Sequence, residues 1–264
     1  MLAGALFTFG WLALGLLVLW EPSLYAILGI GLTLIFQRFV RKRPMAELWV
    51  RPPATPAPLD RRTLLLAAAL AVVPLGWAVW GVLVYQRPLT GLWNLLCALG
   101  ALPAARALRS LDAERRRWLL RALAVSLVVA LAFHGGAAAL RPVVVTGGPF
   151  ERFARAAANL PAYLCAGCAL EEVFFRGAFD AHAGRKGTAG VGSAIFIGVL
   201  GALWRAPLVL LSARHVPLAV VVLVWQAVLG TALCLVVRRS GNLAAGAAVR
   251  ACIDVVRDFV ASPI

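Results

Sequence analysis

Two adjacent glutamates, Glu171 and Glu172, lie inside an otherwise hydrophobic run, and Arg176 follows four residues after Glu172. A carboxylate at membrane depth is energetically expensive, so such residues are rare and usually face a cavity or a partner. On a helix, Glu172 and Arg176 would share one face, with Glu171 about 100° away around the axis. Burial raises the pKa of a carboxyl group, and a nearby cation lowers it. The three residues therefore predict a small charged site.

The composition is that of an integral membrane protein. The chain has 264 residues, of which 62% are hydrophobic and 14% are charged. Soluble domains are about half apolar and about a quarter charged. The hydrophobic runs are long and do not alternate with polar residues, which favours helices over a β-barrel. We therefore expect an all-α fold, a polytopic membrane helix bundle of about eight to nine transmembrane helices.

The hydrophobic runs also give the approximate positions of the helices. We predict helices over residues 3–20, 23–38, 64–85, 90–105, 118–140, 157–179, 188–204, 217–237 and 243–261. Glu21-Pro22 is expected to form a tight turn between the first two. Some segments are shorter than the roughly 20 residues of a span, so 90–105 or one of the first two is a candidate for a tilted or re-entrant helix. Segments 157–179 and 243–261 carry charges in the middle, so we expect neighbouring helices to shield them.

The formal net charge is +15, but its distribution argues against nucleic acid as a partner. The basic residues cluster in short loops between hydrophobic runs, which is the positive-inside pattern of a protein in a lipid bilayer. The alternation of these loops places the N-terminus in the cytoplasm. Many alanines, leucines and arginines with few lysines indicate a high-GC bacterium, so the expected location is a bacterial inner (plasma) membrane.

The cysteines do not point to a disulfide framework or to a metal centre. The five cysteines all lie in hydrophobic segments, and an odd number there favours small packing residues. Cys165 and Cys168 have the spacing of a redox or metal pair but lack convincing further ligands. We therefore expect no metal ion and no cofactor.

The sequence Glu171-Glu172-x-x-x-Arg176, followed by Gly177, resembles the first motif of the CAAX protease and bacteriocin-processing family. Members of this family include the CAAX endopeptidases, which are polytopic, glutamic-type intramembrane proteases. Two further family motifs are written F-x-x-x-H and H-x-x-x-N or H-x-x-x-D. The resemblance covers roughly residues 155–258 and extends to the frames of these two motifs.

The key residues of the second and third motifs differ from the family pattern. The second motif corresponds to Gly201-Ala-Leu-Trp204-Arg205, and the third corresponds to Arg250-Ala-Cys-Ile-Asp254. Arg205 and Arg250 therefore stand where the family has histidines, and Gly201 stands where it has phenylalanine. None of the chain's three histidines, His134, His182 and His215, fits as a replacement.

The resemblance implies a set of site residues. They are Glu171, Glu172, Arg176, Arg205, Arg250 and Asp254. In this reading Glu171 is the base that activates water, Glu172 and Arg176 hold it in place, and Asp254 is a polar orienter. Arginine can donate to an oxyanion as histidine does, but it cannot shuttle a proton. The substitution of arginine for histidine therefore preserves the stabilisation of an oxyanion but puts the transfer of protons in doubt.

The hydrophobic runs, the Pro-rich stretch and the extent of the resemblance together predict the organisation of the chain. We divide it into an N-terminal transmembrane hairpin (1–44), a cytoplasmic Pro-rich linker (45–63), transmembrane helices that precede the core (64–154) and a CAAX-protease-like core (155–264). The stretch from Arg51 to Pro58 is expected to be stiff and extended because four of its eight residues are prolines.

Two classes of function remain open. The first is an intramembrane endopeptidase that uses a glutamate-activated water to cleave the C-terminal region of membrane-tethered or lipidated proteins. Its partner would be a membrane-anchored protein or peptide. The alternative is a catalytically inactive relative that binds membrane peptides or acts as a scaffold, and the loss of both histidines is its main support. A small transporter, and a variant protease with Cys168 as nucleophile, are minor possibilities.

Overall fold

The described part of the chain is all-α, as predicted. The computed structural model describes residues 1–17, 22–84, 86, 88–139, 148–170, 172–185, 187, 190–212 and 216–260. The α-helices are α1 Leu2–Leu16, α2 Pro22–Ile35, α3 Arg61–Leu83, α4 Pro88–Leu99, α5 Ala101–Arg109, α6 Ala113–Ala139, α7 Pro149–Ala158, α8 Leu160–Ala169, α9 Asp180–Arg185, α10 Val191–Ser212, α11 Val216–Ser240 and α12 Leu243–Val260. Two π-helices, η1 Phe36–Arg41 and η3 Val173–Phe179, and a 3-10 helix, η2 Met45–Leu48, complete the described elements.

Several of these helices are long and apolar enough to cross a membrane. By length and composition they are Arg61–Leu83, Ala113–Ala139, Val191–Leu210 and Val216–Ser240, together with the segment Pro88–Arg109, which comprises α4 and α5. On α6, Leu120, Val125 and Val128 point outward and are well exposed. Lipid chains can cover such side chains at no hydrophobic cost, whereas the backbone groups are satisfied within each helix. The chain is therefore an integral membrane protein.

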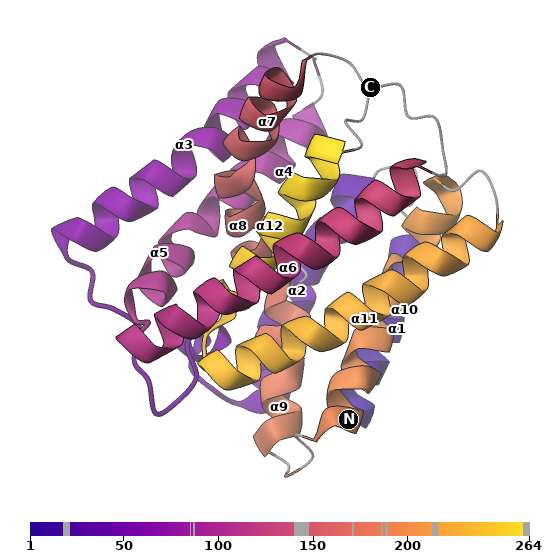
Figure 1. Ribbon diagram of the computed structural model, residues 1–264. Coiled ribbons are helices and arrows are strands. Elements are labelled where there is room, and N and C mark those ends of the chain that lie inside the picture. Colours follow the sequence, from indigo (N-terminus) through magenta and orange to yellow (C-terminus); the bar gives the residue numbers. More distant parts are fainter. Residues whose placement is uncertain are drawn as a thin grey trace.

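The C-terminal helix α12 is central to the bundle. Figure 1 shows this helix in yellow among α6, α8 and α11, and α12 packs against all three. Helix α11 also packs against α10, and these two helices lie side by side at very short range. A Cβ atom added at Gly230 would lie 2.9 Å from the Cα atom of Gly198, so only glycine permits this approach.

The N-terminal hairpin packs directly on the C-terminal helices. The indole N–H of Trp11 donates to the carbonyl oxygen of Tyr25 at 2.7 Å, and the Tyr25 hydroxyl donates to the carbonyl oxygen of Trp204 in α10. The ring of Trp11 also lies nearly parallel to the ring of Phe175 in η3, with 6.2 Å between centroids. Helices α1 and α2 therefore share one hydrophobic core with η3 and α10.

The prediction of one continuous helix over residues 157–179 is wrong. The chain forms α7 and α8, bends at Leu170 (φ −111°, ψ −132°), and resumes as helix at Glu172 before η3. A break leaves carbonyl groups at the end of α8 without intrahelical partners. The carbonyl oxygen of Cys168 instead accepts a hydrogen bond from the indole N–H of Trp49, at 2.7 Å. This partner comes from a distant part of the chain, so local periodicity could not indicate the break.

The predicted helix over residues 90–105 is likewise divided, into α4 and α5 around Gly100. A Cβ atom at Gly100 would collide with the carbonyl oxygen of Cys165 in α8. The joint between α4 and α5 is therefore a point of close contact with the helix that precedes the glutamates. The turn predicted at Glu21-Pro22 falls partly outside the described residues, because residue 21 is among those not described.

The Pro-rich linker is fixed along the helix ends. The backbone N–H of Arg51 donates to the carbonyl oxygen of Gly241 at 2.9 Å. The backbone N–H of Ala57 donates to the carbonyl oxygen of Arg106 at 3.3 Å. Gly241 has φ +63°, a left-handed conformation that favours glycine and ends α11. The linker therefore connects the ends of α5 and α11.

At the end of the linker, Asp60 caps the first turn of α3. Its carboxylate accepts from the guanidinium of Arg109 and from the backbone N–H of Thr63, the latter at 2.8 Å. The hydrogen bond from Arg109, followed by that from Thr63, holds the pKa of Asp60 well below its ordinary value. The cap is thus charged at neutral pH and joins the linker to α5.

The hydrogen bond from Trp49 to the end of α8 gives a testable prediction. We expect Trp49→Phe to lower the free energy of unfolding by about 1–3 kcal/mol, because the Cys168 carbonyl loses its partner. Thermal unfolding in detergent measures this loss. Trp93→Phe is the matched control, because the Trp93 ring packs against the core around η3 and makes no hydrogen bond within the described chain. Equal effects of the two variants would contradict the assigned role of Trp49.

Candidate functional site

The buried ion pair between Glu172 and Arg176 is the centre of the site. Arg176 Nη1 lies 3.1 Å from Glu172 Oε2, and both side chains are 2% exposed. The pair keeps the four-residue spacing expected from the sequence, although its segment is a π-helix. Glu171 lies outside the described residues, so its side chain is not placed and its assignment stays a prediction.

Small residues make room for the guanidinium of Arg176. A Cβ atom at Gly230 would lie 2.7 Å from Arg176 Nη2, and one at Gly201 would lie 3.8 Å from both Nη atoms. Gly201 stands where the motif of the resembled family has phenylalanine, so a large ring there would compete with Arg176 for space. The guanidinium also packs at 5.6 Å from the centroid of the Phe175 ring.

Helix α10 brings Arg205 to the same carboxylate. Arg205 Nη2 lies 3.7 Å from Glu172 Oε1, which is an ion-pair distance but too long for a hydrogen bond. Within the described chain, Glu172 Oε1 is buried and accepts no hydrogen bond. Arg205, at the second-motif position of the sequence, is thus at the same depth in the bundle as Glu172.

Gln226, in the middle of α11, is a residue of this cluster that the sequence analysis missed. Its Oε1 accepts from Arg205 Nη1 at 2.6 Å and from Arg250 Nη1 at 3.0 Å. Arg250 in turn donates through Nε to Asp254 Oδ2 at 2.9 Å. An amide inside an otherwise apolar span was the available signal, because polar groups at membrane depth need partners.

The polar chain continues along α12 toward a more exposed end. Arg257 Nη1 donates to Asp254 Oδ1 and Arg257 Nη2 donates to Asp258 Oδ1, each at 2.9 Å. The hydroxyl of Tyr163 in α8 donates to Asp258. The Arg257 side chain is 43% exposed, whereas Asp254 is 13% exposed. The predicted residues Arg205, Arg250 and Asp254 therefore belong to one network that links α10, α11 and α12.

Asp180 fixes the other end of η3. Its side chain is fully buried and forms ion pairs with Arg51 of the linker at 2.9 Å and with Arg238 of α11 at 2.5 Å. Arg51 also donates to the carbonyl oxygen of Arg176. The backbone of the glutamate segment is thus held at its start by Trp49 and at its end by Asp180.

The chemistry available to this cluster is electrostatic. Guanidinium groups only donate hydrogen bonds, so Arg205 and Arg250 can stabilise a developing negative charge but cannot accept a proton. Among the described histidines, His182 packs edge-on against Phe36, and His134 packs edge-on against Trp225. His215 lies outside the described residues. Any proton transfer at this site would therefore fall to groups other than Arg205 and Arg250.

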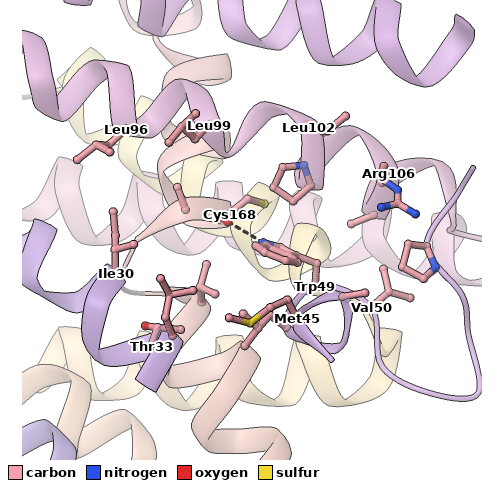
Figure 2. Close-up of a pocket in the computed structure, with 18 residues that line it drawn as sticks. Ile30, Thr33, Met45, Trp49, Val50, Leu96, Leu99, Leu102, Arg106 and Cys168 are labelled. Carbon is pink, nitrogen blue, oxygen red and sulfur yellow. Dashed lines mark hydrogen bonds between the residues drawn. The ribbon is translucent and has the colours of Figure 1, made fainter. Parts of the chain in front are cut away.

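An apolar pocket lies beside the same segment. Its volume is about 460 Å³, and Cys168, Ala169 and Val173 contribute to its wall. Figure 2 shows Ile30, Leu96 and Leu99 around the pocket, with Arg106 at one end and Trp49 bonded to Cys168. An elongated apolar group in this pocket would thus lie next to the break that precedes the glutamates.

Comparison with known proteins supports the resemblance of the motifs. The model of the family described as type II CAAX prenyl endopeptidase Rce1-like matches residues 153–256. No curated protein and no solved structure shows a significant match to the chain. The matched segment contains the ion pair, Arg205, Gln226 and the charged part of α12. Over residues 153–256 the chain is therefore similar to the Rce1-like family of type II CAAX prenyl endopeptidases.

Proposed function

We propose that the chain is an intramembrane endopeptidase that cleaves the C-terminal region of lipidated or membrane-tethered proteins. One observation carries the proposal: within the family segment, Glu172 is paired with Arg176 and faced by Arg205 from the second-motif helix. If the glutamate motif had been retained only by chance, nothing would require α10 to place an arginine beside Glu172. The arrangement supports a working site more than a passive scaffold.

In the proposed reaction, Glu171 takes a proton from water while the water oxygen attacks the scissile carbonyl carbon. The carbonyl oxygen becomes an oxyanion, which Arg205 and Arg250 stabilise by donating hydrogen bonds. The C–N bond then breaks, and Glu171 returns the proton to the leaving nitrogen. Because arginine cannot exchange protons at neutral pH, one carboxylate must perform both transfers.

The other members of the site hold these groups in place. Arg176 neutralises Glu172 at 3.1 Å, and Asp254 accepts from Arg250 Nε at 2.9 Å. Without such partners a charge in the bundle would be strongly destabilising. We assign Glu172, Arg176 and Asp254 to positioning, and Glu171, Arg205 and Arg250 to contact with the reacting atoms.

The apolar pocket supports a lipidated substrate. It is lined almost entirely by hydrophobic side chains and reaches Cys168, Ala169 and Val173 next to the glutamates. A volume of about 460 Å³ suits the alkyl or prenyl chain of a modified cysteine. The peptide that follows the modified cysteine would then extend toward the charged cluster.

The first prediction from this proposal concerns Glu171. We expect Glu171→Gln to abolish cleavage of a farnesylated peptide with a C-terminal CAAX sequence, because an amide cannot accept the proton of water. The variant should still accumulate in the membrane. Glu151→Gln is the control, since Glu151 is an exposed carboxylate on α7 that pairs with Arg155. Mass spectrometry of the peptide products measures cleavage.

Two outcomes would contradict this assignment. Equal cleavage by the wild-type protein and Glu171→Gln would exclude Glu171 as the base. Peptide binding without any cleavage by the wild-type protein would favour the catalytically inactive relative.

A separate prediction concerns Glu172. Glu172→Gln should lower the free energy of unfolding by about 3–5 kcal/mol, because Arg176 would keep a buried charge without a partner.

The second prediction concerns the pocket. We expect Leu96→Trp to raise KM for the farnesylated peptide several-fold and to leave kcat nearly unchanged, because the larger ring occupies space in the pocket. Leu95→Trp, on the same helix but outside this pocket, should leave both constants near their wild-type values. The same KM for both variants would show that the lipid chain binds elsewhere.

A further inference from the structure

We propose that Gln226 is a positioning residue, which holds Arg205 and Arg250 side by side so that both face the substrate. This inference rests on the proposed endopeptidase function. Gln226 belongs to neither of the arginine-bearing motifs and lies on a separate helix, α11, between them in sequence. Its carbonyl oxygen nevertheless bonds to both arginines, at 2.6 Å and 3.0 Å.

The chemistry of the partners fixes the orientation of the amide. Guanidinium groups have only donors, so the Gln226 atom that faces both arginines must be the oxygen. One oxygen has two lone pairs and can accept both bonds. The two arginines carry like charges, and the shared dipole offsets part of their repulsion at short range. Gln226 therefore permits an arrangement that two arginines would not adopt alone.

A neutral amide serves this purpose better than a carboxylate. Arg205 also faces Glu172 at 3.7 Å, and Arg250 is bonded to Asp254. A third negative group would compete for the same donors and would weaken the attraction between the arginines and an oxyanion. Gln226 fixes the geometry and leaves the total charge of the cluster unchanged. The amide thus supplies an uncharged acceptor that both arginines share.

Three variants of the full-length protein in detergent test this role. Gln226→Met keeps the length of the side chain and removes the oxygen. Gln226→Glu restores an acceptor at the same distance. Thr231→Ala is the control, because the Thr231 hydroxyl donates within its own helix, to the carbonyl oxygen of Ala227 at 2.8 Å.

We expect Gln226→Met to lower kcat for the farnesylated CAAX peptide roughly 10- to 100-fold with little change in KM, since small displacements of reacting groups have effects of this size. Gln226→Glu should recover part but not all of the lost kcat, because it restores the acceptor oxygen but adds a negative charge that weakens the attraction between the arginines and an oxyanion. Thr231→Ala should resemble the wild-type protein. A loss of thermal stability without a change in kcat would show that Gln226 is only structural. Equal loss of kcat in Met and Glu variants would show that the oxygen is not the essential atom.

A second readout does not depend on activity. Phenylglyoxal labels accessible arginines, and mass spectrometry locates the modified residues. Gln226→Met should raise labelling of Arg205 and Arg250 at least twofold over the wild-type protein, whereas Thr231→Ala should not. Unchanged labelling would overturn the inference. Raised labelling in a protein that cleaves no peptide would support the positioning role and refute the endopeptidase function.

Discussion

The structure depends on the need to compensate a carboxylate that is buried inside a membrane bundle. Glu172 is 2% exposed and is paired with Arg176, which is equally buried. Gly230 leaves room both for the Arg176 guanidinium and for the close approach of α10 at Gly198, because a Cβ atom there would lie 2.7 Å from Arg176 Nη2 and 2.9 Å from the Gly198 Cα atom. The same carboxylate directs Arg205 inward, and Arg205 in turn requires an acceptor on α11. The order of the helices around the site follows from this sequence of charge compensations.

The sequence was sufficient for those features that depend on residues near one another in the chain. Hydrophobic runs predicted an all-α membrane protein, and a four-residue spacing predicted the contact between Glu172 and Arg176. The break at Leu170 could not be predicted, because the tryptophan that satisfies the Cys168 carbonyl lies far away in the chain. Gln226 was missed for the same reason: a single amide in an apolar span shows that a partner exists but not which helix supplies it. The role of Glu171 stays a prediction.

Replacing histidine by arginine changes which groups can move protons. A histidine near neutral pH can give or take a proton, whereas an arginine stays charged and can only donate hydrogen bonds. The proposed mechanism therefore separates two tasks that histidine combines. In that mechanism, fixed positive charge comes from Arg205 and Arg250, and proton exchange is left to a carboxylate. Such a site would rely on geometry more than on titration, which is why a neutral amide between the arginines matters.

Arg51 belongs to the linker, yet it donates to the backbone carbonyl of Arg176 and forms an ion pair with Asp180. The family match begins only at residue 153. The segment that matches the family model is therefore shorter than the part of the chain that holds the site in place. If this segment were transferred alone into another membrane protein, it would lack the hydrogen bonds that Trp49 and Arg51 donate to it. The other protein would have to supply equivalent donors. Residues upstream of 153 that contact the matched segment, among them Trp49 and Arg51, are therefore part of the unit that holds the site.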